Sequence, residues 1–165
     1  MREILWAPWR MDYILRRKTS ECILCIGENH ERDKERLVLC RSSLSFVIMN
    51  RYPYNNGHLM VAPFHHLSAI EDLAEDTTLD MFRMLKESIG ILRKCLTPEG
   101  FNIGVNMGMA GGAGIEDHLH LHIVPRWNGD TNFMPVLGDV RVMPEHLHTT
   151  YEKLFPHFDA LKAVK

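Results

Sequence analysis

Three histidines that alternate with leucines are the residues of this sequence best suited to chemistry. They occur in the run His118-Leu119-His120-Leu121-His122. Alternate side chains of a strand project to opposite faces, so the three imidazoles share one face and the leucines turn towards the core. A neutral imidazole attacks an electrophilic centre when an acceptor holds its other ring nitrogen. We therefore predict that His120 is a nucleophile flanked by His118 and His122.

Two other interpretations of these histidines stay open. They are solvated polar residues on an exposed sheet face, or they are metal ligands, since imidazole is a common ligand of zinc and related ions. Same-face neighbours on a strand lie roughly 6.5–7 Å apart, at about 3.3 Å of rise per residue. One ion can therefore take one or two of the three imidazoles, but not the whole set.

The loop that precedes the histidines favours phosphorus as the electrophile. Residues 106–115 include four glycines, and the last of these residues lies three positions before His118. Glycine lets backbone N–H groups approach an anion closely, as in phosphate-binding nests. A phosphate cradled beside a nucleophile indicates an enzyme that transfers or hydrolyses nucleotides.

Composition limits the setting in which this chemistry occurs. The 165 residues are enough for one domain with a hydrophobic core, and we expect residues 1–165 to form one. A net charge of −2 argues against binding to nucleic acid or to anionic membranes. No apolar stretch spans a bilayer, and the N-terminus lacks the apolar region of a signal peptide. We expect a cytoplasmic protein whose four cysteines are free thiols or metal ligands.

Hydrophobic periodicity predicts the elements that position the histidines. Strand-like runs occur at five places: Arg36–Cys40, Ser45–Met49, His58–Ala62, Phe101–Met107 and His118–Val124. A long helix is predicted over Asp76–Cys95 because apolar residues recur at three- and four-residue spacing, namely Leu79, Phe82, Leu85, Ile89 and Leu92. A short C-terminal helix is predicted over 154–161, and residues 25–36 are expected to form a loop. These elements predict an α+β fold with a mainly antiparallel five-stranded sheet.

The histidine run resembles the signature of the histidine triad (HIT) family. Residues 118–125 match its alternating H-φ-H-φ-H-φ-φ pattern, and residues 106–114 and 50–63 resemble two further family motifs. The resemblance covers a core of about residues 22–126, leaving an N-terminal arm (1–21) and a C-terminal extension (127–165). Residues 5–10 and 125–133 are similar to a bacterial branch that includes diadenosine tetraphosphate phosphorylases. The resemblance implies a HIT-like fold.

The resemblance also implies a reaction. His120 would attack the α-phosphate of a dinucleoside polyphosphate such as diadenosine tetraphosphate, or of a related nucleotide, and form a nucleotidyl-histidine. Water or phosphate would then release the nucleotide, and the sequence leaves this acceptor open. The alternative is a nucleotide-binding or sensory module with little turnover. The resemblance implies no organic cofactor, and it implies a homodimer formed through the long helix and the sheet edge.

Residue roles follow from the same resemblance. Asn50 falls at the ribose-binding position, and Leu24 and Ile48 fall near the base pocket. The phosphates would be surrounded by loop residues Asn106, Gly112, Ala113 and Gly114. Many members have a Gln-Ser or Gln-Thr pair in this loop, whereas residues 112–115 of this chain have no side-chain donor, so backbone N–H groups must serve. Trp127 would contact a second nucleoside or the partner subunit.

Cys22 and Cys25 form a C-x-x-C pair, which has the spacing of half a tetrahedral zinc site. In some members of the family such a pair is joined by a later histidine and by the first histidine of the triad, here His66 and His118. His65 is an adjacent alternative to His66. Zinc would then be structural and tie the N-terminal arm to the histidine strand. Otherwise the two cysteines line the base pocket as small apolar residues.

Overall fold

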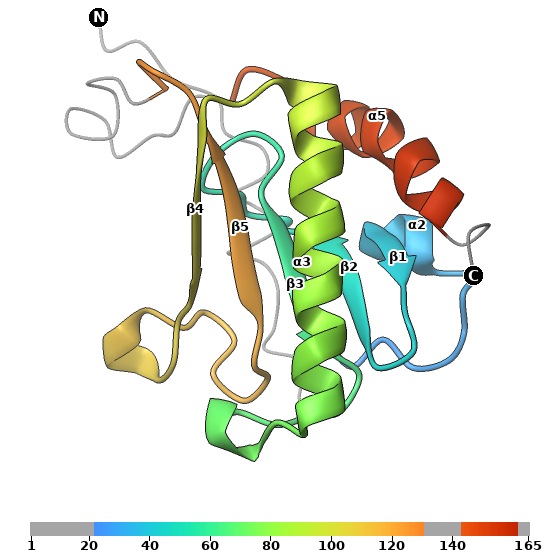
Figure 1. Cartoon of the computed structure of the whole chain (residues 1–165), viewed down its shortest axis with the longest axis vertical. Coiled ribbons are helices and arrows are strands. Elements are labelled where there is room, and N and C mark those ends of the chain that lie inside the picture. The colour runs from blue at the N-terminus through green and yellow to red at the C-terminus, as the bar shows by residue number, and fades with distance from the viewer. Residues whose placement is uncertain (1–21, 131–142, 162–165) are drawn as a thin grey trace, which may run out of the picture.

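A computed structural model describes residues 22–130 and 143–161 and contains a five-stranded antiparallel sheet (Figure 1). The strand order is β1-β2-β3-β5-β4, so β5 lies between strands that precede it in the sequence. The strands are β1 (Val38–Arg41), β2 (Ser45–Met49), β3 (Leu59–Pro63), β4 (Gly100–Val105) and β5 (Leu121–Arg126). The helical elements are α2 (Asp33–Arg36), η1 (Ile70–Asp72), α3 (Glu75–Leu96), η2 (Met109–Gly111) and α5 (Leu147–Asp159). The predicted α+β architecture is confirmed.

The two faces of the sheet are buried by different partners. Figure 1 shows α3 lying across one face with α5 beside it, and the main apolar core fills the space between these helices and the sheet. On the opposite face a smaller apolar cluster consists of Leu24, Ile26, Val38, Phe46, Ile48, Met60 and Ala62. Alternation along β5 places Leu121 and Ile123 in the main core and turns His122 to the opposite face.

The long helix was predicted within a residue or two of its ends, but its buried face was not. Leu79 and Phe82 are 52% and 58% exposed, whereas the buried face carries Met81, Met84, Leu85, Ser88, Ile91 and Leu92. Apolar residues occupy more than one side of this helix, so three- and four-residue spacing is found both on the buried face and on the exposed face. The helix ends at Thr97, which has the left-handed conformation (φ 48°) and donates its N–H to the Arg93 carbonyl.

A buried carboxylate joins α3 to the β1–β2 hairpin. Asp80 is 9% exposed and accepts hydrogen bonds from the hydroxyls of Ser42 and Ser45, the latter at 2.6 Å. The Leu44 N–H lies 3.3 Å from the same oxygen. A buried charge is tolerated when several donors satisfy it, so this contact fixes the hairpin on the helix.

Several predicted boundaries differ from the structure by a few residues, and three changes are the most informative. Residues 25–36 include the single-turn helix α2, and α5 begins at Leu147, well before position 154, because Tyr151 also belongs to its buried stripe. Strand β5 begins at Leu121 and not at His118. Its pairing with β3 stops at Val61, because the Pro63 carbonyl accepts from the His118 ring and the Leu119 N–H bonds to Leu67.

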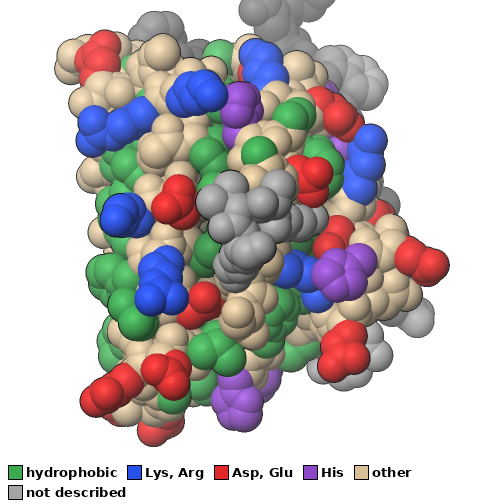
Figure 2. All heavy atoms as spheres, turned by 45° about the vertical axis from the view of Figure 1, so that its right-hand side comes forward, with side chains coloured by type: hydrophobic (Ala, Val, Ile, Leu, Met, Phe, Trp, Pro, Cys, Tyr) green, Lys and Arg blue, Asp and Glu red, His purple; other side chains and the backbone are tan. Residues whose placement is uncertain are grey.

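The predicted N-terminal arm (1–21) and much of the C-terminal extension (131–142 and 162–165) lie outside the described residues. No helix in the described ranges is both long and apolar enough to cross a membrane. On the face shown in Figure 2, acidic and basic side chains are interspersed, so this face has no field of a single sign.

Candidate active site

The three histidines are buried in β5 and in the residues just before it. His118, His120 and His122 are 0%, 3% and 8% exposed, so the solvated-face interpretation is wrong for them. The strand register aligns Ile48, Met60, His122 and Gly104 in one row across four strands. An apolar surface therefore lies on one side of His122, and Gly104, which has no side chain, lies on the other.

A backbone carbonyl fixes the orientation of the His120 ring. Its Nδ1 lies 2.8 Å from the His118 carbonyl oxygen. A carbonyl only accepts hydrogen bonds, so neutral His120 carries its proton on Nδ1 and the lone pair is on Nε2. This is the tautomer that a nucleophile attacking through Nε2 needs.

The tautomer of His122 is fixed by a chain of hydrogen bonds. The Tyr54 N–H donates to His58 Nδ1 at 3.0 Å, so neutral His58 carries its proton on Nε2. That nitrogen lies 2.9 Å from His122 Nδ1, which must accept, and neutral His122 therefore presents an N–H at Nε2. Burial, with a smaller contribution from His120, lowers the pKa of His122 to about 4. His122 is thus a neutral hydrogen-bond donor beside His120, with ring centroids 4.7 Å apart.

His58 was not assigned a role from the sequence, although the Gly57-His58 pair lies in a family-like motif. His58 is fully buried at the start of β3. Gly57 has φ +72°, and a Cβ at this position would lie 2.5 Å from Leu96 Cδ1. Only glycine fits this turn easily, and the turn delivers His58 to His122. A histidine that begins an otherwise apolar strand was the signal available in the sequence.

The C-x-x-C pair meets two histidines. The side chains of Cys22, Cys25, His66 and His118 place one ligand atom each within 4.8 Å of one another. Cys22 Sγ lies 3.4 Å and Cys25 Sγ 3.7 Å from His118 Nδ1, and Cys25 Sγ lies 3.2 Å from His66 Nδ1. Tetrahedral zinc, with Zn–S near 2.3 Å and Zn–N near 2.0–2.1 Å, places sulfur and nitrogen about 3.5 Å apart. These residues therefore fit a zinc-type ion.

This cluster answers two questions that the sequence left open. Among the described residues it includes His66 and not His65, and it includes one histidine of the triad, His118. The other nitrogen of His118, Nε2, lies 2.9 Å from the Pro63 carbonyl oxygen and donates to it. A metal-ligating histidine typically holds its second N–H in this way, which leaves Nδ1 as the ligand.

The predicted nucleotide-binding residues lie at different distances from the histidines. Leu24 and Ile48 belong to the apolar cluster on the histidine face, 1% and 6% exposed. Asn50 follows β2, and its Oδ1 accepts from the Tyr52 N–H. Trp127 lies beyond the far end of β5, roughly 20 Å along the chain from His120, with its ring N–H bonded to the Thr97 carbonyl.

The glycine-rich loop bonds mainly to itself. The N–H groups of Gly112 and Ala113 donate to the Met109 and Gly108 carbonyls, and Asn106 Nδ2 donates to the Gly112 carbonyl at 3.3 Å. Glu116 accepts from the Met109 N–H at 2.9 Å. For Gly112 and Ala113 to hold phosphate through these N–H groups, the loop must exchange internal hydrogen bonds for bonds to the anion.

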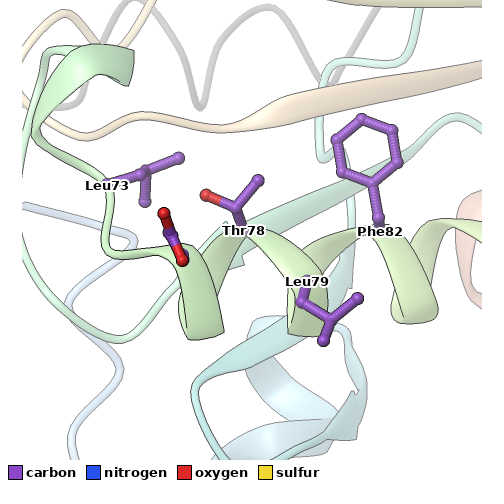
Figure 3. Close-up of a pocket in the computed structure, with 5 residues that line it drawn as sticks. Leu73, Thr78, Leu79 and Phe82 are labelled. Atoms are coloured by element: carbon purple, nitrogen blue, oxygen red, sulfur yellow. The ribbon is translucent and has the colours of Figure 1, made fainter.

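Two hollows lie away from the histidines. One of about 480 Å³ lies at the start of α3 and is lined by Leu73, Glu75, Thr78, Leu79 and Phe82 (Figure 3). The other, about 300 Å³, lies among α2, β1 and α5 and has a mixed lining of charged and apolar residues. Neither is lined by a residue of the triad.

Comparison with known proteins places the chain in a family. The HIT domain profile matches residues 31–129. An AP-4-A phosphorylase of Mycobacterium tuberculosis is 36% identical over 154 residues, which cover 88% of this chain and 79% of that protein. An asymmetrical bis(5'-nucleosyl)-tetraphosphatase of Schizosaccharomyces pombe is 29% identical over 56% of this chain and 50% of its own length.

A solved structure has a similar fold. The crystal structure of a Zn-bound histidine triad family protein from Mycobacterium smegmatis superimposes with a TM-score of 0.65 and 24% identity, covering 87% of this chain and 95% of that one. The sequence match and the fold agree with the buried histidine run. The chain belongs to the histidine triad (HIT) family.

Proposed function

We propose that this protein cleaves a dinucleoside polyphosphate, of the diadenosine tetraphosphate type, through a nucleotidyl-histidine on His120. The observation that carries the proposal is the hydrogen bond from His120 Nδ1 to the His118 carbonyl, which leaves the Nε2 lone pair for attack. The bond from Nε2 to the α-phosphorus forms as the bond to the bridging oxygen breaks. With diadenosine tetraphosphate, ATP leaves and AMP stays on His120.

The second half of the reaction returns the histidine to its neutral form. Phosphate or water attacks the α-phosphorus, the P–N bond breaks, and the product is ADP or AMP respectively. The 36% identity to an AP-4-A phosphorylase supports phosphate as the acceptor, and the likeness to a tetraphosphatase supports water. His122 supports both steps, since its Nε2–H donates to a phosphate oxygen without carrying a charge that would need a counter-ion.

The row of Ile48, Met60, His122 and Gly104 across the sheet supports one orientation of the bound nucleotide along that row. The base lies towards the apolar cluster that includes Leu24 and Ile48, and the ribose lies near Asn50. The phosphate chain passes His120 towards Gly104 and the loop of Asn106, Gly112, Ala113 and Gly114, where a Cβ on Gly104 would meet nothing within 4 Å. In this arrangement Trp127 of the same chain is too distant to contact the α-phosphate.

The cluster of Cys22, Cys25, His66 and His118 holds a structural zinc-type ion in this proposal. Two thiolates and two imidazoles are a preferred donor set for Zn²⁺, and the measured separations match a tetrahedral site. Such an ion, when bound, contributes binding free energy to folding and ties the segment of Cys22 and Cys25 to the residues before β5.

A second copy of the chain is the partner proposed for the exposed side of α3. Leu79 and Phe82 project from this helix, and Ile103 of β4 is 45% exposed. Strand β4 is at the edge of the sheet formed by the described residues, where its backbone is available for pairing with another strand. Covering this surface in a homodimer removes exposed apolar area from water. The proposed setting is the cytoplasm, where the two thiolates stay reduced.

Product analysis tests the proposed activity. Diadenosine tetraphosphate is incubated with the wild type and with His120→Ala, with and without inorganic phosphate, and the nucleotides are separated. ADP and ATP formed only with phosphate establish phosphorolysis, and AMP and ATP formed without phosphate establish hydrolysis. Both require loss of turnover in His120→Ala with retained nucleotide binding. Tight binding without His120-dependent turnover would support the binding-module alternative instead.

A further inference from the structure

His118 is a residue of the predicted metal site formed with Cys22, Cys25 and His66, and its backbone carbonyl also holds the ring of the nucleophile His120. Its Nδ1 faces the two thiols, and its Nε2 donates to the Pro63 carbonyl at 2.9 Å. Its own carbonyl accepts the Nδ1–H of His120 at 2.8 Å. One peptide group therefore determines which nitrogen of His120 carries the proton, and the side chain next to that peptide group is a predicted metal ligand.

The segment around His120 has little other support from the sheet. Regular pairing of β5 with β3 begins only at Leu121, so His118 and His120 precede the ladder. The Leu119 N–H instead donates to the Leu67 carbonyl at 2.6 Å, and Leu67 follows the cluster residue His66 directly. Segments 63–67 and 118–120 are hydrogen-bonded to each other, and each contributes one histidine, His66 or His118, to the predicted metal site.

We propose that Cys22, Cys25 and His66 are positioning residues for the nucleophile, and that a bound zinc-type ion fixes His120 through the peptide group of His118. The inference rests on the proposed function, and it gives these ligands a role in orienting His120 in addition to joining two segments of the chain. Without an ion, the two thiols meet the imidazoles through contacts of 3.2–3.7 Å, and thiols are weak hydrogen-bond donors, so the link from the cysteines to His118 is weaker than metal ligation. The His118 peptide then has more freedom, and His120 loses its fixed acceptor.

A positioning role predicts a specific kinetic pattern. Cys25 and His66 lie at the exposed side of the cluster, whereas Cys22 packs against the apolar residues proposed to hold the base. Changes at Cys25 and His66 therefore alter the support of His120 without touching the proposed nucleotide site. We expect kcat to fall about 10–100-fold, the usual effect of losing a partner that orients a site residue, with KM changed less than about 2-fold.

The experiment compares five forms of the whole chain with one control variant. They are wild type as purified, wild type after chelation, chelated wild type with Zn²⁺ restored, Cys25→Ser, and His66→Asn, which keeps three ligands and guards against loss of folding. His65→Asn is the matched control, because His65 is the adjacent histidine outside the cluster. Bound metal is measured by elemental analysis, and the His120 tautomer by ring ¹⁵N NMR, a property that a merely structural role would leave unchanged.

The expected result is a single Nδ1–H tautomer of His120 only in the metal-loaded wild type and in His65→Asn. Chelation should lower kcat and mix the tautomers, and Zn²⁺ should restore both. A folded, metal-free protein that keeps the Nδ1–H tautomer and wild-type kcat would overturn the inference, as would wild type that binds no Zn²⁺. Absence of turnover in every form would refute the proposed function instead, because the tautomer measurement still tests positioning.

Discussion

The neutral state of His122 leads to a quantitative prediction for the dependence of stability on pH. The folded-state pKa of this residue is about 4, against an ordinary histidine pKa of 6.5, because burial disfavours the charged ring. As the pH falls below 6.5, the unfolded chain takes up a proton here that the folded protein does not. The folded state is therefore destabilised progressively between pH 6.5 and pH 4, and this contribution is constant outside that window.

The size of the effect follows from the shift. A difference of about 2.5 pKa units at roughly 1.4 kcal/mol each corresponds to about 3 kcal/mol lost by pH 4, an order-of-magnitude figure. Other groups titrate in the same range, so the useful quantity is the difference between wild type and His122→Asn. The asparagine oxygen can still accept the His58 Nε2–H but does not titrate, which makes this variant a matched reference.

Urea unfolding at half-unit steps from pH 7 to pH 4.5 measures this difference. The free energy of unfolding of the wild type should fall more steeply than that of the variant below pH 6.5, by about 2 kcal/mol or more at pH 4.5. Parallel curves for the two proteins would show that His122 takes up a proton in the folded state as readily as in the unfolded state. The assignment of His122 as an uncharged donor would then be refuted.

Three further predictions concern other contacts. His58→Ala removes the donor to His122 Nδ1, so kcat should fall by about 10–100-fold with little change in KM, and steady-state kinetics that match the wild type would contradict the chain of tautomers. Asp80→Ala removes the carboxylate that accepts from the buried Ser45 hydroxyl and the half-buried Ser42 hydroxyl, and it should lower the free energy of unfolding by about 2–4 kcal/mol in urea titrations while KM is unchanged. A change within about 0.5 kcal/mol, on the scale of ordinary surface substitutions, would show that the carboxylate is dispensable. Phe82→Glu should convert the proposed dimer to a monomer in analytical ultracentrifugation, whereas Glu87→Ala, another exposed change on α3, should not; a wild type that is already monomeric would disprove the dimer.

The sequence was most informative where a period or a motif repeats. Alternation located the strands, three- and four-residue spacing located α3, and the histidine run with its glycine-rich loop indicated the family. The buried side of α3 was not predicted: Leu85 and Leu92 of the predicted stripe are buried, but Met81 and Met84 complete the buried face and Phe82 faces outward. Spacing alone does not distinguish the stripe that meets the sheet from one that remains exposed.

Apart from the cysteine–histidine cluster that the family resemblance implied, contacts between distant segments were not predicted from the sequence. His58 meets His122 across 64 positions, and the choice of His66 over His65 depends on the path of the chain after β3. The strand predicted from His118 also failed at its first three residues, where the His118 ring donates to the Pro63 carbonyl and the Leu119 N–H donates to the Leu67 carbonyl in place of the ladder. These differences lie around His120, where backbone carbonyls accept hydrogen bonds from histidine rings and do not pair with a neighbouring strand.

The measurement that tests the central claim most directly is a single-turnover trapping experiment. Excess wild-type protein is mixed with adenine-labelled diadenosine tetraphosphate, quenched at alkaline pH within milliseconds, and mapped by peptide mass spectrometry. The proposed mechanism predicts one adenylyl group on His120, formed as fast as ATP is released and absent from His120→Ala. ATP released without a covalent adenylyl group, or the group found on another residue, would contradict it.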